Sequence, residues 1–330
     1  MIKWGIIGLG RMACIFAESI KELKETKLVA AASLNSSRLR NFSKKYNIVD
    51  DFQFSNYDEI LKCKEIDAIY ISTLNNTHAE LITKSIRAKK NVLCEKPITV
   101  HYQEMTDIIK VIENENVHFS EAIAYRSHPI TTELVQLLKQ KEVGKIESIE
   151  SSFSFLVKRI NPYSRLFNKK LGGGAILDVG CYPLSFLNLI SNLDESNNDI
   201  IIEKANGKFC MTGVDEFCTA ELVVSGYIKA KITAGIRKLC KNVNIIKTSN
   251  GQIRIVEPWT PGKKTYIEVD INSSYYKKFV MCNHSIYANQ INLFNKMIKD
   301  KSTMKFPYLT FNDTVKISKL SSEWRKKIEL

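Results

Sequence analysis

Gly8-Leu9-Gly10-Arg11-Met12-Ala13 decides the fold of this chain, because the stretch stands between a short apolar segment and an amphipathic one. Residues 3–7 have the composition of a buried strand, and apolar residues recur at helical spacing from residue 13 to residue 23. A strand, a glycine turn and a helix in this order predict the start of a nucleotide-binding sheet. A chance glycine turn is the alternative, and the flanking elements argue against it.

The residue types inside this stretch suit a dinucleotide. Gly8 permits a tight turn, and Gly10 lets the backbone approach a pyrophosphate. Ala13 is small enough for close packing of the helix on the strand. Arg11 and Met12 begin the helix, whose free N–H groups and positive dipole end would face the phosphates. We therefore expect Gly8, Gly10, Arg11 and Met12 to contact a dinucleotide cofactor.

The first 120 residues alternate strand-like and helix-like segments with short connections. This alternation predicts an α/β fold with a doubly wound parallel sheet. The expected strands are residues 3–7, 28–32, 68–71, 92–94 and 117–120. Apolar residues at helical spacing predict a helix after each of the first four strands. We assign residues 1–120 to a dinucleotide-binding Rossmann domain.

Beyond residue 120, alternating polar and apolar residues become common and helices few. Strands are expected at residues 146–157, 217–224, 228–234, 243–248, 252–256 and 265–269. Asn250-Gly251 is a hairpin turn signal, because both residues tolerate positive φ. Helices are expected after Gly174 and over residues 285–298. Residues 121–330 are thus predicted to form an α+β domain with an open, mostly antiparallel sheet, which binds substrate and forms the oligomer.

The composition predicts a soluble protein with a large core. The chain has 330 residues, of which 44% are hydrophobic, and no apolar run is long enough to span a bilayer. The first apolar segment already contains the glycine turn, which argues against a cleavable leader. The eight cysteines are scattered and lack metal-ligand spacing with the five histidines. We expect a cytoplasmic protein with reduced thiols and no metal site.

The net charge of +13 suggests nucleic-acid binding as one hypothesis. Lysines and arginines are, however, spread along the whole chain instead of forming one basic arm. Attraction of an anionic cofactor is a simpler explanation of a basic surface. We expect neither a nucleic acid nor a membrane as partner.

The segment after the second expected strand bears on the choice of cofactor. Residues 33–38 contain no Asp or Glu to bind the ribose 2′-hydroxyl of NAD. Ser33 and Ser36 can donate hydrogen bonds to a 2′-phosphate, and Arg38 can pair with it. These residues favour NADP over NAD. The alternative is that Arg38 is an ordinary surface residue and the pocket accepts either cofactor.

Glu95-Lys96-Pro97 puts a lysine at the end of the strand expected at residues 92–94. Ligands of open α/β sheets gather at the carboxyl ends of the strands. Lys96 is therefore placed to meet a substrate beside the cofactor. The plain alternative is a lysine that extends from a turn into water, where most lysines lie.

Separate segments of the chain carry a family resemblance. They are residues 66–73 with 75–78, Lys90-Asn91-Val92-Leu93-Cys94-Glu95-Lys96-Pro97, residues 121–122 with 125–129, and residues 172–183. Together they resemble the Gfo/Idh/MocA family of oxidoreductases. Gly180-Cys181-Tyr182-Pro183 is most similar to the branch that contains dihydrodiol dehydrogenase, xylose dehydrogenase and glucose-fructose oxidoreductase, and members of that branch favour NADP.

The resemblance implies a nicotinamide-dependent dehydrogenase or reductase. It implies further cofactor contacts at Thr73, Leu74, Asn75, His78, Glu95 and Lys96. The chain departs from the family at Leu74, where a proline is frequent, and in residues 184–186, which lack a common aspartate. The resemblance also implies a homodimer or homotetramer, formed through the antiparallel sheet.

Lys96, Asp178 and Tyr182 are the expected catalytic residues. Tyr182 would transfer the proton and Lys96 would stabilise the charge, or their roles would be reversed. Asp178 and Tyr182 are four residues apart on an expected helix, so they would share one face. Asp178 would bind a substrate hydroxyl or hold Lys96. The plain alternatives are a helix-dipole role for Asp178 and a core position for Tyr182.

Three basic residues are expected to bind substrate, namely Arg126, His128 and Arg165. Their charge favours an anionic or polyhydroxylated small molecule. The leading hypothesis is hydride transfer between NADP and a carbinol or carbonyl carbon of a sugar, polyol or cyclic diol. The alternative is a catalytically silent regulator that senses a nucleotide on the same scaffold.

Overall fold

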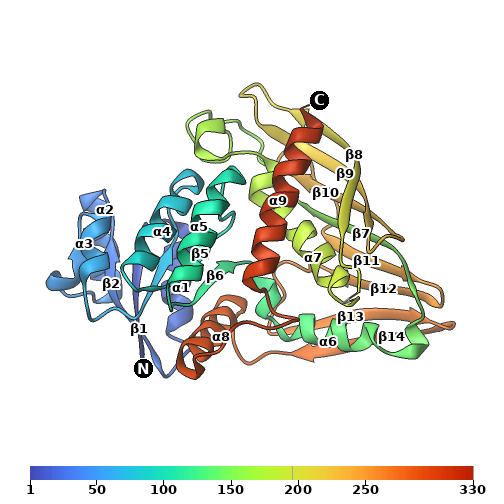
Figure 1. Cartoon of the computed structure of the whole chain (residues 1–330), viewed down its shortest axis with the longest axis horizontal. Helices are drawn as coiled ribbons and strands as arrows, with labels where there is room; N and C mark the ends of the chain where they lie inside the picture. The colour runs from blue at the N-terminus through green and yellow to red at the C-terminus, as the bar shows by residue number, and fades with distance from the viewer. Residues whose placement is uncertain (195, 330) are drawn as a thin grey trace. The chain divides into compact units, whose positions relative to one another are not determined.

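The computed structural model describes residues 1–194 and 196–329, and it divides the chain into two compact units (Figure 1). The first unit comprises Met1–Ile123 and Tyr287–Met304, and the second comprises Ala124–Ile286 and Lys305–Leu330. The sequence analysis divided the chain into residues 1–120 and 121–330. It did not predict that residues 287–304 belong to the first unit.

The first unit is built on a six-stranded parallel sheet in the order β3-β2-β1-β4-β5-β6. Its strands are β1 (Ile2–Ile7), β2 (Thr26–Ala32), β3 (Gln53–Phe54), β4 (Ala68–Ile71), β5 (Asn91–Glu95) and β6 (Phe119–Ala122). The order reverses at β1, as in a doubly wound sheet. The predicted parallel sheet is confirmed.

Helices cover both faces of this sheet. They are α1 (Arg11–Ile20), α2 (Ser36–Tyr46), α3 (Tyr57–Lys62), α4 (His78–Arg87), α5 (Gln103–Asn114) and α8 (Ile286–Asp300). The sequence analysis placed α8 in the second domain. Its buried residues Ala288, Ile291, Phe294 and Met297 instead pack with Trp4 in the core of the first unit. A helical apolar stripe in the sequence identifies the helix but not the sheet that it covers.

The second unit is built on an eight-stranded sheet in the order β14-β13-β12-β11-β7-β10-β9-β8. Its strands are β7 (Ile146–Ser154), β8 (Ile200–Phe209), β9 (Asp215–Val224), β10 (Ile228–Gly235), β11 (Val243–Thr248), β12 (Gly251–Val256), β13 (Lys264–Ile271) and β14 (Ser274–Met281). Among the strands that the structure describes in this sheet, only β7 and β10 pair in parallel, which confirms the mostly antiparallel sheet. The sequence analysis missed β8 and β14, the two edge strands, because most of their side chains are exposed and the alternating pattern is weak.

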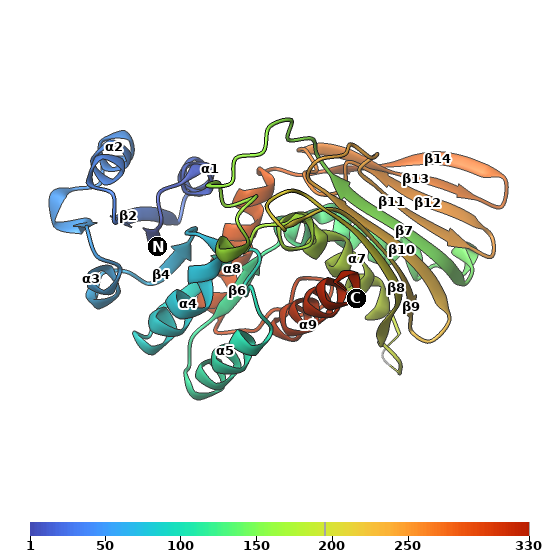
Figure 2. The same cartoon turned by 90° about the horizontal axis from the view of Figure 1, so that it is seen from above.

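Helices α6 (Pro129–Leu138), α7 (Cys181–Ser191) and α9 (Phe311–Ile328) pack on this sheet. Figure 2 shows α7 and α9 on one face of it. A π-helical turn, Ile176–Gly180, leads into α7. The stretch Lys169–Ser191 has the length and hydropathy of a membrane span, but its 18-residue apolar window is 94% buried inside the fold, as in the core helix of a globular protein.

Candidate active site

Gly8 and Gly10 have different surroundings at the end of β1. Gly8 has φ +87°, and a Cβ there would lie 2.7 Å from Thr73 Cγ2 and 2.9 Å from the carbonyl carbon of Ser72. The turn itself therefore requires Gly8. A Cβ on Gly10 would meet no atom within 4 Å. The space in front of Gly10 is open, as the approach of a ligand to the backbone requires.

The first turn of α1 offers N–H groups to an anion. Gly10 is the N-cap residue and supplies no side-chain cap, and the turn contains no acidic residue. Arg11 is exposed and Met12 is half-buried at its start. The Oγ atom of Ser72 donates to the carbonyl of Gly8 at 2.7 Å, which holds the glycine turn in place. These features fit the pyrophosphate of a dinucleotide.

The turn after β2 presents hydroxyl groups and one guanidinium. Ser33 is buried, and its Oγ accepts from the backbone N–H of Asn35 at 3.2 Å. Asn35 caps α2 by accepting from the backbone N–H of Arg38 at 2.8 Å. Ser36 and Arg38 are exposed. Over residues 1–194 and 196–329 the Arg38 side chain has no ion-pair partner, so its charge is available to a ligand.

The turn after β4 lies beside the glycine turn. Thr73 contacts the position of Gly8 as described above, and its Oγ1 accepts from Thr77 Oγ1 at 2.7 Å. Leu74 is 41% exposed, and Asn75 is buried at the start of the 3-10 turn Asn75–Thr77. Leu74 therefore offers apolar surface at the carboxyl edge of the sheet.

Glu95 and Lys96 lie at the carboxyl end of β5. Glu95 is buried, and the Tyr70 hydroxyl from β4 donates to its Oε1. The Tyr70 ring stacks on Phe16 with centroids 3.9 Å apart. Lys96 follows and is half-buried. The carboxylate is thus held at the edge of the sheet where ligands of this architecture bind, with the lysine next to it.

His78 is fully buried at the start of α4, and its Nδ1 lies 2.8 Å from the carbonyl oxygen of Pro97. The ring has no exposed surface for a ligand. We therefore assign His78 to holding the Lys96-Pro97 segment in position. This replaces the direct cofactor contact expected from the sequence.

Tyr287 of α8 is a residue of this region that the sequence analysis missed. Burial raises the pKa of its phenol, Glu95 raises it further, and the positive charges of Lys96 and Arg11 lower it. These effects place the phenol within electrostatic range of all three groups. Its position in the sequence, far beyond the Rossmann segment, gave no signal for this location.

Tyr182 lies in an aromatic cluster of the second unit. The cluster consists of Tyr125, Phe153, Tyr182, Phe186 and Trp259. The Tyr182 ring centroid lies 5.0 Å from that of Phe153, 5.7 Å from Trp259 and 6.3 Å from Tyr125. The members come from separate elements, so no local sequence pattern predicts the cluster. Tyr182 itself is half-buried at the start of α7.

Tyr125 is the second phenol of the aromatic cluster. Its hydroxyl shares a 2.7 Å hydrogen bond with Ser185 Oγ, which also donates to the carbonyl of Tyr182 at 2.8 Å. Burial raises the pKa of Tyr125 to about 12, although Arg126 opposes the shift. Tyr125 therefore stays protonated near neutral pH and supports the helix that carries Tyr182.

Asp178 is buried in the π-helical turn and accepts from Arg165 Nη1 at 2.9 Å. The Arg165 side chain is 48% exposed. The turn follows π-helical geometry, so the regular α-helical relation expected between Asp178 and Tyr182 does not apply. Asp178 and Arg165, predicted separately as catalytic and substrate-binding, form one ion pair.

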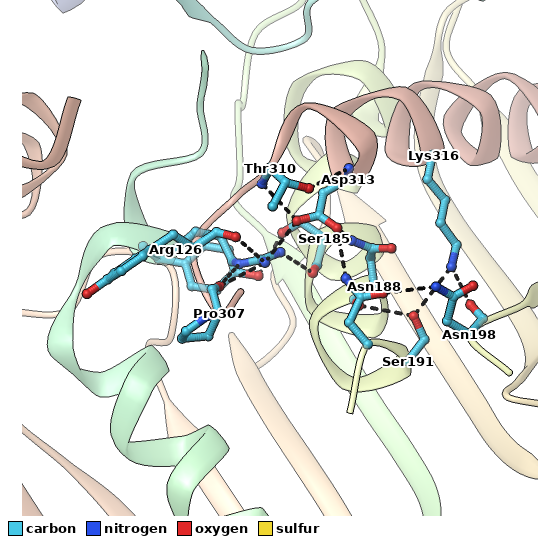
Figure 3. Close-up of polar contacts among 12 residues, drawn as sticks. Arg126, Ser185, Asn188, Ser191, Asn198, Pro307, Thr310, Asp313 and Lys316 are labelled. Carbon is cyan, nitrogen blue, oxygen red and sulfur yellow. Dashed lines mark hydrogen bonds and ion pairs between the residues drawn. The ribbon is translucent and has the colours of Figure 1, made fainter. Parts of the chain in front are cut away.

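Arg126 is fully buried and serves the fold of the second unit (Figure 3). Its guanidinium donates to the carbonyls of Ser185 at 3.1 Å, Pro307 at 2.9 Å and Tyr308 at 3.3 Å, and it pairs with Asp313 at 3.4 Å. Asp313 also accepts from Asn188, Asn192 and the backbone of Thr310. The substrate contact expected for Arg126 is therefore replaced by a structural role.

His128 is also buried, and its Nδ1 caps α6 by accepting from the backbone N–H of Ile130 at 3.1 Å. Burial lowers its pKa, so the ring is neutral near pH 7. The predicted substrate contact of His128 is replaced by this capping role. Of the three basic residues expected to bind substrate, only Arg165 is exposed.

Replacing Arg126 by Met is expected to lower the free energy of unfolding by about 2–3 kcal/mol, because buried carbonyls and Asp313 lose a charged donor. Urea denaturation followed by circular dichroism measures the change. Lys326→Met, an exposed change on α9, is the control and should have little effect. An unfolding curve for Arg126→Met that overlays the wild type would contradict this role.

A doubly wound parallel unit followed by an α+β unit is the architecture of two-domain nicotinamide-dependent oxidoreductases. Residues 2–123 match the Gfo/Idh/MocA oxidoreductase family with its NAD-binding Rossmann fold, and residues 131–239 match the C-terminal domain of the same family. The chain belongs to the Gfo/Idh/MocA family. It is thus an NAD(P)-dependent oxidoreductase.

The chain is also similar to individual proteins of known activity or structure. The chain is 30% identical over 276 residues to trans-1,2-dihydrobenzene-1,2-diol dehydrogenase of Xenopus laevis, a match that covers 81% of both chains. A crystal structure of the 3-ketoreductase KijD10 of Actinomadura kijaniata, in complex with NADP and TDP-benzene, matches with a TM-score of 0.87 and 21% identity. The aldose-aldose oxidoreductase of Caulobacter crescentus matches with a TM-score of 0.87 and 17% identity. Both structural matches cover 99% of this chain and 97% of the other, and they establish the fold alone.

Proposed function

We propose that the protein is an NADP-dependent dehydrogenase or reductase that acts on a carbinol or carbonyl carbon of a sugar, polyol or cyclic diol. The observation that carries this proposal is the half-buried phenol of Tyr182, set among aromatic rings at the start of α7. The match to dihydrodiol dehydrogenases supports the same class of substrate. Bound NADP supplies the hydride acceptor or donor.

In this proposal, Tyr182 transfers the proton to or from the substrate oxygen. Lys96 of the first unit stabilises the charge that develops on this oxygen, because an ammonium favours a phenolate or alkoxide near it. The proposal requires Lys96 and Tyr182 to approach the same substrate atom. Asp178, held by Arg165, accepts a hydrogen bond from a neighbouring substrate hydroxyl.

The aromatic cluster favours a cyclic substrate. Phe153 and Tyr182 are half-buried and border the buried ring of Trp259. Apolar ring faces pack against the C–H faces of sugars and cyclic diols, while a nearby carboxylate and phenol bind their hydroxyls. This combination suits a ring with adjacent hydroxyl groups.

A substrate screen tests the proposed function. Sugars, polyols and cyclic diols are incubated with NADP, and the corresponding ketones or aldoses with NADPH, while the absorbance of the reduced nicotinamide is followed. We expect turnover with at least one cyclic compound that carries vicinal hydroxyls. Tight binding of NADPH without turnover of any compound would instead favour a catalytically silent nucleotide sensor.

We further propose NADP as the preferred cofactor, because the turn after β2 offers the hydroxyls of Ser33 and Ser36 and the guanidinium of Arg38, and residues 33–38 contain no carboxylate. Arg38→Gln is expected to raise the KM for NADP by about tenfold, because one charge-assisted pair is lost, and to leave the KM for NAD unchanged. Arg40→Gln, exposed on the same helix, is the matched control. A wild-type enzyme that prefers NAD would reject this assignment.

The location and oligomeric state complete the proposal. All eight cysteines are free, which suits the reducing cytoplasm.

The open face of the eight-stranded sheet exposes Tyr275, Phe279 and Met281 on β14, which suits a homodimer or homotetramer. Light scattering coupled to size-exclusion chromatography measures the mass, and a monomer at micromolar concentration would contradict the oligomer.

A further inference from the structure

A basic loop, residues 155–175, connects β7 to the π-helical turn. It contains five cationic residues and no Asp or Glu. The cationic residues are Lys158, Arg159, Arg165, Lys169 and Lys170. Apart from an isolated antiparallel bridge between Leu156 and Arg237, the loop contains the short 3-10 turn Lys169–Leu171. A loop of this length with charge of one sign is typical of a segment with a binding role.

The start of the basic loop is fixed next to the aromatic cluster. Phe153, two residues before the loop, packs against Tyr182 with centroids 5.0 Å apart. Arg237 Nη1 then donates to the carbonyl of Val157 at 3.0 Å and to that of Lys158 at 2.9 Å. These bonds hold the backbone at Lys158 in one place.

The end of the basic loop is fixed next to Asp178. A Cβ on Gly173 would lie 2.6 Å from the carbonyl oxygen of Leu166 and 2.8 Å from that of Arg165, so only glycine lets these segments approach. Phe167 is buried and anchors the loop in the core. The Arg165 side chain reaches Asp178 at 2.9 Å. Both ends of the loop therefore adjoin residues assigned to the substrate.

The charge of the basic loop is only partly neutralised. Arg165 pairs with Asp178, and Lys169 pairs with Glu329 at 3.4 Å on the surface. Lys158, Arg159 and Lys170 are exposed, and none of them pairs with any residue that the structure describes. Unpaired cations on a preformed loop attract an anion without the loss of an existing ion pair.

We propose that the basic loop selects a substrate that carries an anionic group, a phosphate ester or a carboxylate, on the ring that Tyr182 acts upon. This inference rests on the proposed function and narrows its substrate class. Lys158 and Arg159 bind the anionic group. Arg165 links the loop to Asp178, so the anion and the substrate hydroxyls are recognised by one connected set of side chains.

The experiment compares a neutral substrate with two charged counterparts, for which glucose, glucose 6-phosphate and glucuronate serve as the first set. At saturating NADP and low salt, we expect kcat/KM for one charged compound to exceed that for glucose by at least about tenfold, which corresponds to about 1.4 kcal/mol. The two charged compounds distinguish phosphate from carboxylate recognition. Added salt should reduce the preference, because exposed charges are screened.

The double variant Lys158→Gln/Arg159→Gln should lose this preference and keep the wild-type kcat/KM for the neutral substrate. Lys319→Gln/Lys326→Gln on α9 removes the same charge from exposed positions and should retain the preference. Equal kcat/KM values for charged and neutral compounds in the wild type would overturn this inference but leave the proposed function standing. The inference would also be overturned if the Lys158→Gln/Arg159→Gln variant showed a higher KM for NADP but kept the preference for the charged substrate. Absence of turnover with every compound would reject the proposed function, and the inference with it.

Discussion

Tyr182→Phe is expected to reduce kcat by about 10²- to 10⁴-fold, the usual contribution of a positioned proton donor or acceptor. The ring keeps its contacts with Phe153 and Trp259, so the fold and the binding of NADPH should be unchanged. Stopped-flow measurement of nicotinamide absorbance gives kcat, and fluorescence titration gives the Kd for NADPH. Tyr163→Phe, 89% exposed in the basic loop, is the matched control.

Lys96→Met should reduce kcat by a similar factor, because the charge that develops on the substrate oxygen is no longer stabilised by a cation. Lys110→Met, exposed on α5, is its control. The pH dependence of kcat separates the two roles, since the variant that lacks the proton-transfer group loses the titration of that group. If both Tyr182→Phe and Lys96→Met kept the wild-type kcat, the assignment of these residues as catalytic would be rejected. If only one variant lost activity, the residue replaced in that variant would be the catalytic group.

Gly10→Val should weaken NADP binding by roughly 10²- to 10⁴-fold, because about two charge-assisted hydrogen bonds of ~1.5–3 kcal/mol each become unavailable. The added side chain meets no protein atom near its Cβ, so it occupies the open space where a phosphate would approach α1. Stability should therefore change little. Calorimetric titration with NADP and a thermal unfolding curve measure the two quantities on the same sample.

Gly8→Ala provides the contrast to Gly10→Val. Its Cβ would lie 2.7 Å from Thr73 Cγ2 at a φ of +87°, so this variant should lose stability as well as cofactor binding. If Gly10→Val binds NADP as tightly as the wild type, the dinucleotide does not lie over this turn. If Gly10→Val loses as much stability as Gly8→Ala, the space in front of Gly10 is not free.

Local sequence patterns predicted the two sheets but not every element in them. The apolar strands beside the glycine turn were identified because both faces of a parallel sheet are buried. The edge strands β8 and β14 were missed because their side chains are mostly exposed. α8 was identified as a helix but assigned to the wrong unit, since an amphipathic stripe does not specify its partner.

The basic candidates for substrate binding illustrate a second limit. Arg126, His128 and Arg165 look alike in the sequence, yet Arg126 and His128 are buried by contacts with Pro307, Asp313 and Ile130. Two of these three partners are more than 180 residues away from Arg126 along the chain. Charge alone predicts an exposed ligand contact, and only long-range packing reveals a structural role.

The sequence by itself determined the nucleotide-binding architecture, because a turn with positive φ, an open backbone and a helix N-terminus depend on residues that are adjacent in the chain. Tertiary structure alone decided which aromatic rings surround Tyr182 and that Asp178 pairs with Arg165. It also decided that Tyr287 returns to the first unit. These contacts join separate elements, and their formation depends on the packing of the whole unit rather than on local conformational preference.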